Sequence, residues 1–86
     1  MSNYAVVWQP PAEARLLALY IRAADKDALS AATARIDEIL GRNPLDQGES
    51  REGVRRIWFY RPLCLTFLVD DDARVVYVTA VKWAGR

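Results

Sequence analysis

The chain has 86 residues, 52% of them hydrophobic, and twelve basic against eleven acidic side chains give a formal charge of +1. This length predicts one domain spanning residues 1–86, and the hydrophobic fraction excludes an intrinsically disordered chain. A charge this close to zero does not by itself indicate a nucleic-acid partner.

Cysteine usage and apolar runs point to a cytoplasmic protein. Cys64 is the single cysteine, so an intramolecular disulfide is excluded and a reducing compartment fits. The first residues lack the charged and apolar regions of a signal peptide, and no run approaches the ~20 apolar residues of a membrane span. We therefore expect no membrane partner.

The first 24 residues predict one strand and one helix. Residues Tyr4–Trp8 are β-branched and aromatic, and the pair Pro10 and Pro11 ends this strand. Proline is tolerated in the first turn of a helix, so a helix is expected from about Pro11. Its apolar positions recur at helical spacing: Leu16, Leu17, Tyr20, Ile21 and Ala24.

A second helix follows after a short connection. Asp25 is the predicted N-cap, Gly41 the predicted left-handed stop, and Pro44 confirms that the helix has ended. The connection at residues 23–26 is short enough to require an antiparallel helix hairpin. The apolar stripe comprises Leu29, Ala32, Thr33, Ile36, Ile39 and Leu40.

The second half predicts a loop at residues 42–53 and then three strands. These are Val54–Tyr60, Leu63–Asp70 and Val75–Lys82, and the short turns between them require antiparallel pairing. The fold class is therefore α+β with the order β-α-α-β-β-β. A helix hairpin packs on one face of a small, mainly antiparallel twisted sheet.

Two of the strands are apolar on both faces. Leu63, Leu65, Phe67 and Val69 alternate with Cys64, Thr66 and Leu68, and Val75, Tyr77 and Val81 alternate with Val76, Val78 and Ala80. An antiparallel sheet with one wet face alternates more cleanly. One helix hairpin covers one face, so the second face requires sheet curvature, the loop, or a partner chain.

Several chemistries are excluded. The chain contains no histidine, which removes Cys/His metal sites, Ser-His-Asp triads and Cys-His pairs. It also lacks the glycine patterns of P-loops and dinucleotide-binding folds. The run Asp70–Asp72 is interpreted as a hairpin turn rather than a cation site. We expect neither a metal nor a cofactor.

Basic residues gather in the second half, at positions Arg51, Arg55, Arg56, Arg61, Lys82 and Arg86. Arg55 and Arg56 are adjacent on a strand and face opposite sides, Arg56 with Trp58 and Arg55 with Phe59. Arginine beside aromatics suits phosphate binding with base stacking. The alternative is an edge strand protected by charge, with the aromatics in the core.

The element order and several short motifs resemble the RelE/ParE superfamily of bacterial type II toxin–antitoxin toxins, and the resemblance covers essentially the whole chain. The motifs are the loop residues Pro44-Leu45, Gly48 and Ser50, an Arg-x-x-x-aromatic strand, and the hairpin sequence of residues 65–78.

The resemblance implies a toxin that is neutralised by a cognate antitoxin, whose wrapping segment would cover the second sheet face. ParE-like toxins bind and inhibit DNA gyrase, whereas RelE-like toxins cut messenger RNA on the ribosome with basic residues and a tyrosine. A third alternative is a non-toxic protein-binding module of the same fold.

The resemblance also suggests site residues. As target or partner contacts these are Arg51, Arg55, Arg56, Arg61, Lys82 and Trp83; for a ribonuclease they are Arg51, Arg56, Arg61 and Lys82. The ribonuclease arginine of the family falls on Leu63, Trp83 replaces an expected cation, and the given sequence ends at Arg86, before the tail that usually supplies the family's tyrosine. The closer resemblance is therefore to ParE-like toxins, which act by binding.

Overall fold

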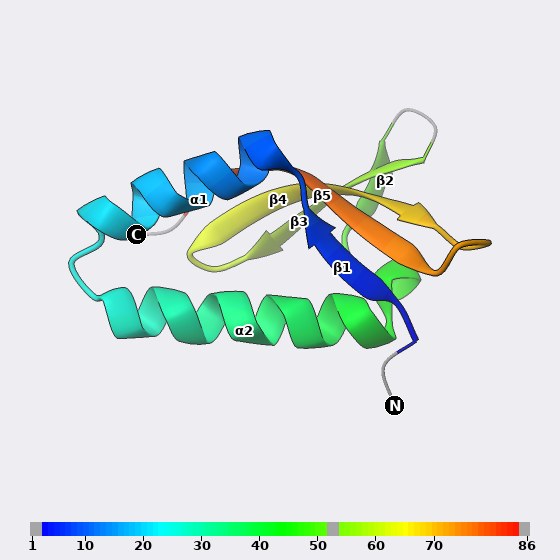
Figure 1. Cartoon of the computed structure of the whole chain (residues 1–86), viewed down its shortest axis with the longest axis horizontal. Helices are drawn as coiled ribbons and strands as arrows, with labels where there is room; N and C mark the ends of the chain where they lie inside the picture. The colour runs from blue at the N-terminus through cyan, green and yellow to red at the C-terminus, as the bar shows by residue number, and fades with distance from the viewer. Residues whose placement is uncertain (1–2, 52–53, 85–86) are drawn as a thin grey trace.

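The computed structural model describes residues 3–51 and 54–84, with Arg51 described in its backbone alone (Figure 1). In chain order the elements are β1 (Ala5–Trp8), α1 (Pro10–Arg22), α2 (Lys26–Arg42), η1 (Pro44–Asp46), β2 (Glu49–Arg51), β3 (Arg55–Tyr60), β4 (Leu63–Asp70) and β5 (Val75–Trp83). The predicted α+β class and element order are confirmed. The predicted loop at 42–53 was too simple, because it contains the 3-10 turn η1 and the short strand β2.

The strands form one mixed sheet in the order β1-β5-β4-β3-β2. Strand β1 runs parallel to β5, with Ala5 opposite Val75, and the other neighbours are antiparallel, as the short turns predicted. The connection from β1 to β5 contains both helices and the strands β2, β3 and β4, so it is far longer than the dozen residues that a parallel pair requires. Both helices lie on one face of the sheet (Figure 1).

Of the two predicted ends of α2, the N-terminal one is confirmed and the C-terminal one is wrong. The Asp25 carboxylate accepts a hydrogen bond from the Ala28 amide at 2.9 Å, which confirms the predicted N-cap. Gly41 is not the predicted stop, because α2 continues to Arg42 and is capped at Asn43. Gly41 instead lies buried where the N-terminal segment docks, and its carbonyl accepts from the amides of Asn3 at 2.8 Å and Tyr4 at 2.9 Å.

The core lies between the helices and the inward face of the sheet. Its fully buried side chains come mainly from α2, β4 and β5: Leu29, Ile36, Leu40, Leu63, Leu65, Phe67, Val76 and Val78. Each such side chain contributes about 1.5–3 kcal/mol by leaving water. No helix in the described part of the chain is long and apolar enough to cross a membrane.

A β-bulge changes which residues of β5 face this core. The register between β4 and β5 shifts at Thr66 and Phe67, so that Phe67 pairs with Val78 but Leu65 pairs with Val81. The extra residue turns Val81 inward, where it is 5% exposed. The prediction that Val81 shares a face with Val75 and Tyr77 was therefore wrong, because simple alternation cannot anticipate a bulge.

Candidate target-binding face

The sheet face opposite the helices carries three cross-strand rows on β3, β4 and β5, which we call the bare face. Directly opposed residues project to the same side of a sheet. The rows are Phe59–Cys64–Lys82, Ile57–Thr66–Ala80 and Arg55–Leu68–Tyr77. Phe59 is 67% exposed although it is a large apolar side chain. The prediction of a second apolar face is thus met, and no helix of residues 3–51 and 54–84 covers it (Figure 1).

Two of the predicted cations, Arg55 and Lys82, lie on the bare face but at different rows. Lys82 is in the row of Cys64 and Arg55 is in the row of Leu68, four residues further along β4. At about 3.3 Å per residue the two rows are roughly 13 Å apart, and two strand spacings separate the residues sideways. This backbone spacing suits several separate contacts to a large partner better than one catalytic cluster.

Arg61 and Trp83 lie at the end of the sheet where β3 turns into β4. Arg61 is exposed in that turn. Trp83 pairs with Leu63, which places it on the helix side, opposite to Lys82, and it is 48% exposed. It borders a hollow of about 420 Å³ together with Leu19 and Pro62. Trp83 and Lys82 therefore do not form one contact surface.

Arg56 has a different place from the other basic residues. Its Nε donates to the Gln47 carbonyl at 2.9 Å, and its two terminal nitrogens donate to the Ser50 hydroxyl at 3.0 Å and the Gly48 carbonyl at 3.4 Å. The planar guanidinium thus fastens the segment before and within β2 to β3. The structure places Arg56 in a structural clamp on the opposite side of β3 from Arg55.

The clamped segment also requires a glycine at position 48. Gly48 has φ of +68°, and a Cβ there would lie 2.4 Å from the Ile57 carbonyl oxygen. Both the left-handed conformation and the close backbone approach exclude a side chain. Gly48 and Arg56 therefore fix the same short edge strand.

The remaining predicted cations are only partly described. In the backbone register Arg51 pairs with Arg55, and Ser50 pairs with Arg56. Arg86 lies outside the described residues.

Most aromatic residues next to the arginines belong to the core. The ring of Trp58 lies 5.4 Å from that of Tyr60 and 6.3 Å from that of Phe67, and Trp58 is 9% exposed. The alternative interpretation from the sequence is right that Trp58 and Tyr60 pack in or against the core. It is wrong that their strand is an edge strand, because β2 pairs with β3 on its outer side. Phe59 is the exception, since it projects from the bare face.

Sequence reasoning missed a groove in the helix layer. It has a volume of about 700 Å³ and runs between α1 and α2, and its lining consists of Pro10, Glu13, Ala14, Leu16, Leu17, Tyr20, Ser30, Thr33, Ala34 and Asp37. Leu17 is 60% exposed and Ile21, one turn later, is 65% exposed. Both had been assigned to the core stripe of α1. The available signal was that the apolar stripe of α1 is wide. One margin of so wide a stripe can pack on the core while the other margin faces solvent.

The acidic run between β4 and β5 acts as a turn, as predicted. The Asp70 carboxylate accepts from the Ala73 amide at 3.0 Å, and Asp71 accepts from the Tyr4 hydroxyl. The Arg74 guanidinium lies over the Tyr4 ring, 5.0 Å from its centre. The hydrogen bond between Tyr4 and Asp71 is the main cause that raises the pKa of Tyr4 above its ordinary value.

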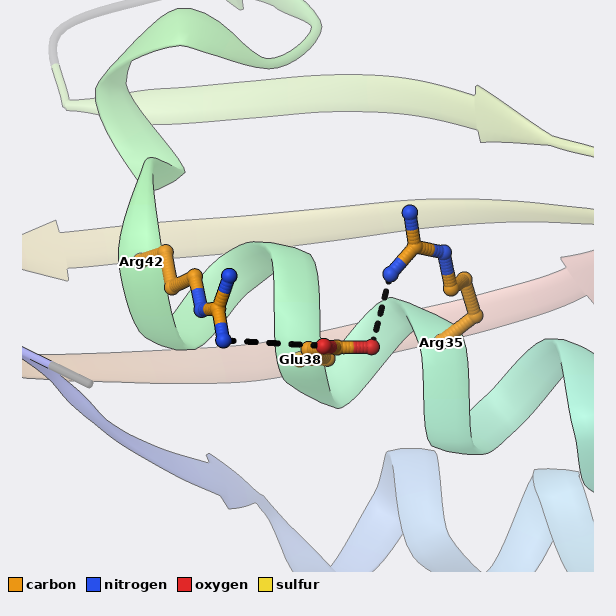
Figure 2. A network of polar contacts seen from close by, with 3 residues as sticks. All are labelled: Arg35, Glu38 and Arg42. Carbon is orange, nitrogen blue, oxygen red and sulfur yellow. Dashed lines mark hydrogen bonds and ion pairs between the residues drawn. The ribbon is translucent and has the colours of Figure 1, made fainter. Parts of the chain in front are cut away.

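On α2, two further arginines share one carboxylate. Glu38 contacts Arg35 at 2.7 Å and Arg42 at 3.7 Å, one turn before and one turn after it (Figure 2). The hydrogen bond that the Arg35 guanidinium donates to the Glu38 carboxylate raises the pKa of Arg35. All three side chains are largely exposed, so the pairs stabilise the helix only modestly and belong to neither surface described above.

Comparison with known proteins identifies the fold. No family model and no curated protein matches the chain. Among solved structures, a chain of the toxin–antitoxin complex RelBE2 from Mycobacterium tuberculosis superposes with a TM-score of 0.78 at 21% identity, over 100% of this chain and 97% of that one. A chain of the chromosomal ParDE toxin–antitoxin system from P. aeruginosa gives 0.72 at 14% identity, over 95% and 97%. The RelE/ParE-like fold expected from sequence is confirmed.

Proposed function

We propose that this chain is the toxin of a type II toxin–antitoxin module, that it acts by binding its target in the manner of gyrase inhibitors, and that a cognate antitoxin neutralises it. The observation that carries the proposal is the fold match over the whole chain to chains from two toxin–antitoxin systems. Because likeness at these identities concerns the fold, the surfaces of this chain must supply the rest.

The bare face is the proposed target surface. Phe59 is exposed in its end row, and its cations Arg55 and Lys82 stand at separate rows. An aromatic anchor with dispersed positive charge suits recognition of a macromolecular partner. Catalysis of RNA cleavage requires groups that converge on one phosphate, which the spacing of these two residues does not favour.

The groove between α1 and α2 is the proposed place of an antitoxin segment. It combines an apolar lining with the carboxylates of Glu13 and Asp37, and Leu17 projects beside it. An amphipathic helix with basic residues at its margin would match this surface. Target and antitoxin would then use opposite sides of the sheet, with part of the antitoxin free to continue over the bare face.

The first experiment is inducible expression in bacteria, with supercoiling by purified gyrase as the second readout. We expect growth arrest and a loss of supercoiling. Lys82→Glu and Arg55→Glu should each weaken both effects, whereas Arg15→Glu on the exposed surface of α1 should leave them unchanged. Growth arrest with intact supercoiling and codon-specific message cleavage would instead establish the ribosome-dependent ribonuclease.

A third outcome of the expression experiment distinguishes a toxin from a non-toxic binding module of the same fold. If the chain never arrests growth, at any expression level and without a co-expressed neighbour, the non-toxic binding module of the same fold replaces both toxin assignments. A short upstream reading frame whose product binds the chain and restores growth would support the antitoxin.

A further inference from the structure

Strand β2 lies at the outer edge of the sheet and continues the bare face beyond β3 (Figure 1). Its register places Arg51 directly opposite Arg55 and Glu49 directly opposite Ile57. Because directly opposed residues share a face, position 51 joins the row of Arg55, and position 49 joins the neighbouring row. Strand β2 therefore adds one basic and one acidic position to the bare face.

The bonds that hold this strand in place come largely from Arg56. Its guanidinium donates to the Gln47 carbonyl at 2.9 Å, to the Ser50 hydroxyl at 3.0 Å and to the Gly48 carbonyl at 3.4 Å. The strand itself consists of three polar residues, and basic residues directly opposite each other disfavour a strand pair. The clamp thus holds a pairing that the sequence of β2 does not favour.

We propose that Arg56 is a positioning residue for Arg51. By clamping β2 to β3 it keeps Arg51 in the row of Arg55, where the two basic positions together meet an acidic surface of the target. Arg56 itself does not touch the target. This inference rests on the proposed function, and it replaces the direct target contact that the sequence predicts for Arg56.

The orientation of Arg56 supports an indirect role. Its register partner on β4 is Phe67, which is fully buried on the helix side of the sheet. Arg56 therefore projects away from the bare face, and three of its donor contacts are made within the chain. A partner on the bare face meets Arg55 but not Arg56.

The acidic residues of this region determine where an acidic partner surface fits. Asp70 and Asp72 stand at the β4–β5 turn, and the Asp70 carboxylate accepts from the Ala73 amide. Position 51 is two strand spacings from β4, or roughly 10 Å sideways. The acidic surface therefore fits at the β2–β3 edge, where opposite charges attract, and is repelled at the turn.

The test is a double-mutant cycle with two readouts, supercoiling by purified gyrase and growth arrest on expression. Arg51→Glu should raise the half-inhibitory concentration about tenfold in the wild type but less than about threefold in Arg56→Ala, because β2 no longer holds position 51 in its row. Lys82→Glu, roughly 13 Å away along the strands, should have the same effect in both backgrounds. Growth arrest gives the same comparison whichever target the chain binds.

Conservative variants separate position from charge. Arg56→Lys keeps the charge but lacks the planar guanidinium that makes three bonds, so it should weaken inhibition as Arg56→Ala does. Gly48→Ala should also weaken inhibition with Arg56 intact, because a Cβ there lies 2.4 Å from the Ile57 carbonyl oxygen. Arg15→Ala removes an exposed arginine of α1 and is the control that should change nothing.

Amide hydrogen exchange tests the clamp without target or antitoxin. The Ile57 carbonyl approaches Gly48, so the Ile57 amide also faces β2. Its exchange should become about tenfold faster in Arg56→Ala and in Gly48→Ala, because local opening of the edge strand becomes easier. Exchange of the Tyr77 amide in β5 should not change, which shows that the rest of the sheet is intact.

Three outcomes would overturn the inference while the proposed function stands. They are an equal effect of Arg51→Glu in both backgrounds, an Arg56→Lys variant that inhibits like the wild type, and unchanged exchange at Ile57 in Arg56→Ala. A wild-type chain that neither inhibits gyrase nor arrests growth would instead overturn the proposed function and the target contact of Arg51. Hydrogen exchange would still decide whether Arg56 holds β2.

Discussion

At the residue scale, the adjacent arginines on β3 have different surroundings. Arg56 makes three charge-assisted hydrogen bonds within the chain, two to main-chain carbonyls and one to Ser50. Arg55 is exposed on the other face. Strand parity predicted that they separate. It could not predict that Arg56 binds the segment before β3, because that contact depends on how the loop folds back.

This difference predicts unequal effects on stability. Arg56→Ala should lower the free energy of unfolding by about 1–3 kcal/mol, because the carbonyls of Gln47 and Gly48 lose a charged donor. Arg55→Ala, the matched neighbour, should change it by less than about 1 kcal/mol, because polar interactions of an exposed side chain contribute little. Urea unfolding followed by circular dichroism measures both. Equal losses for the two variants would show that the clamp contributes no stability.

Tyr4 predicts a dependence of stability on alkaline pH. Its pKa is raised above the ordinary value of 10.0, chiefly by its hydrogen bond to Asp71. A raised folded pKa means that the contribution is complete below the unfolded pKa and is lost as pH rises through the folded one. The free energy of unfolding of the wild type should therefore fall more than that of Tyr4→Phe between pH 8 and pH 11. Parallel decreases would exclude a role for this hydroxyl.

At the scale of elements, α1 and α2 differ in how far their apolar stripes are used. In α2 the stripe is buried, with Ile36 at 0% exposure, whereas in α1 Leu17 remains 60% exposed. Helical spacing located both stripes correctly. It could not tell which apolar residue of a wide stripe faces the sheet, because this depends on how the two helices diverge.

A pair of substitutions distinguishes the two environments. Ile36→Ala should cost about 2–5 kcal/mol of unfolding free energy, because it leaves a cavity in the core. Leu17→Ala should cost less than about 1 kcal/mol, since the side chain is mostly in water already. Thermal and urea unfolding supply the measurement. A large loss for Leu17→Ala would mean that the groove is closed in solution.

Strand β2 shows the limit of sequence analysis for elements. Its residues, Glu49–Arg51, are polar and have no strand-like alternation. They become a strand because Gly48 permits a tight approach to β3 and Arg56 holds it there. The residues that create this strand act through partners eight or nine positions away in the sequence. Neither local strand propensity nor periodicity can therefore detect it. The bulge in β5 escaped prediction because strict alternation of faces does not anticipate an extra residue in a strand.

At the scale of the molecule, the proposed surfaces lie on different sides of the sheet. The groove is in the helix layer and the bare face is opposite to it (Figure 1). If each has the proposed partner, substitutions should separate two phenotypes. Leu17→Glu should keep growth arrest but lose neutralisation by the co-expressed antitoxin, and Lys82→Glu should lose arrest while antitoxin binding persists.

Pull-down of the antitoxin together with growth curves measures both effects. A Leu17→Glu variant that is neutralised normally would remove the groove from the antitoxin surface. The element order and the antiparallel pairing of β3, β4 and β5 were predictable because they follow from local spacing and short turns. The location of these surfaces was not, because exposure of an apolar residue is decided by distant packing.

The parallel pairing of β1 with β5 has a consequence for the order of events during synthesis. Ala5 finds its register partner only at Val75, so a ribosome must add about seventy residues before the first strand can be paired. Until then β5 is absent, and the helix hairpin can pack only against the strands that have already been synthesised. Closing so long a loop is slow compared with forming either hairpin. The growing chain therefore cannot display a finished sheet, and any activity that depends on it begins only after β5 has left the ribosome.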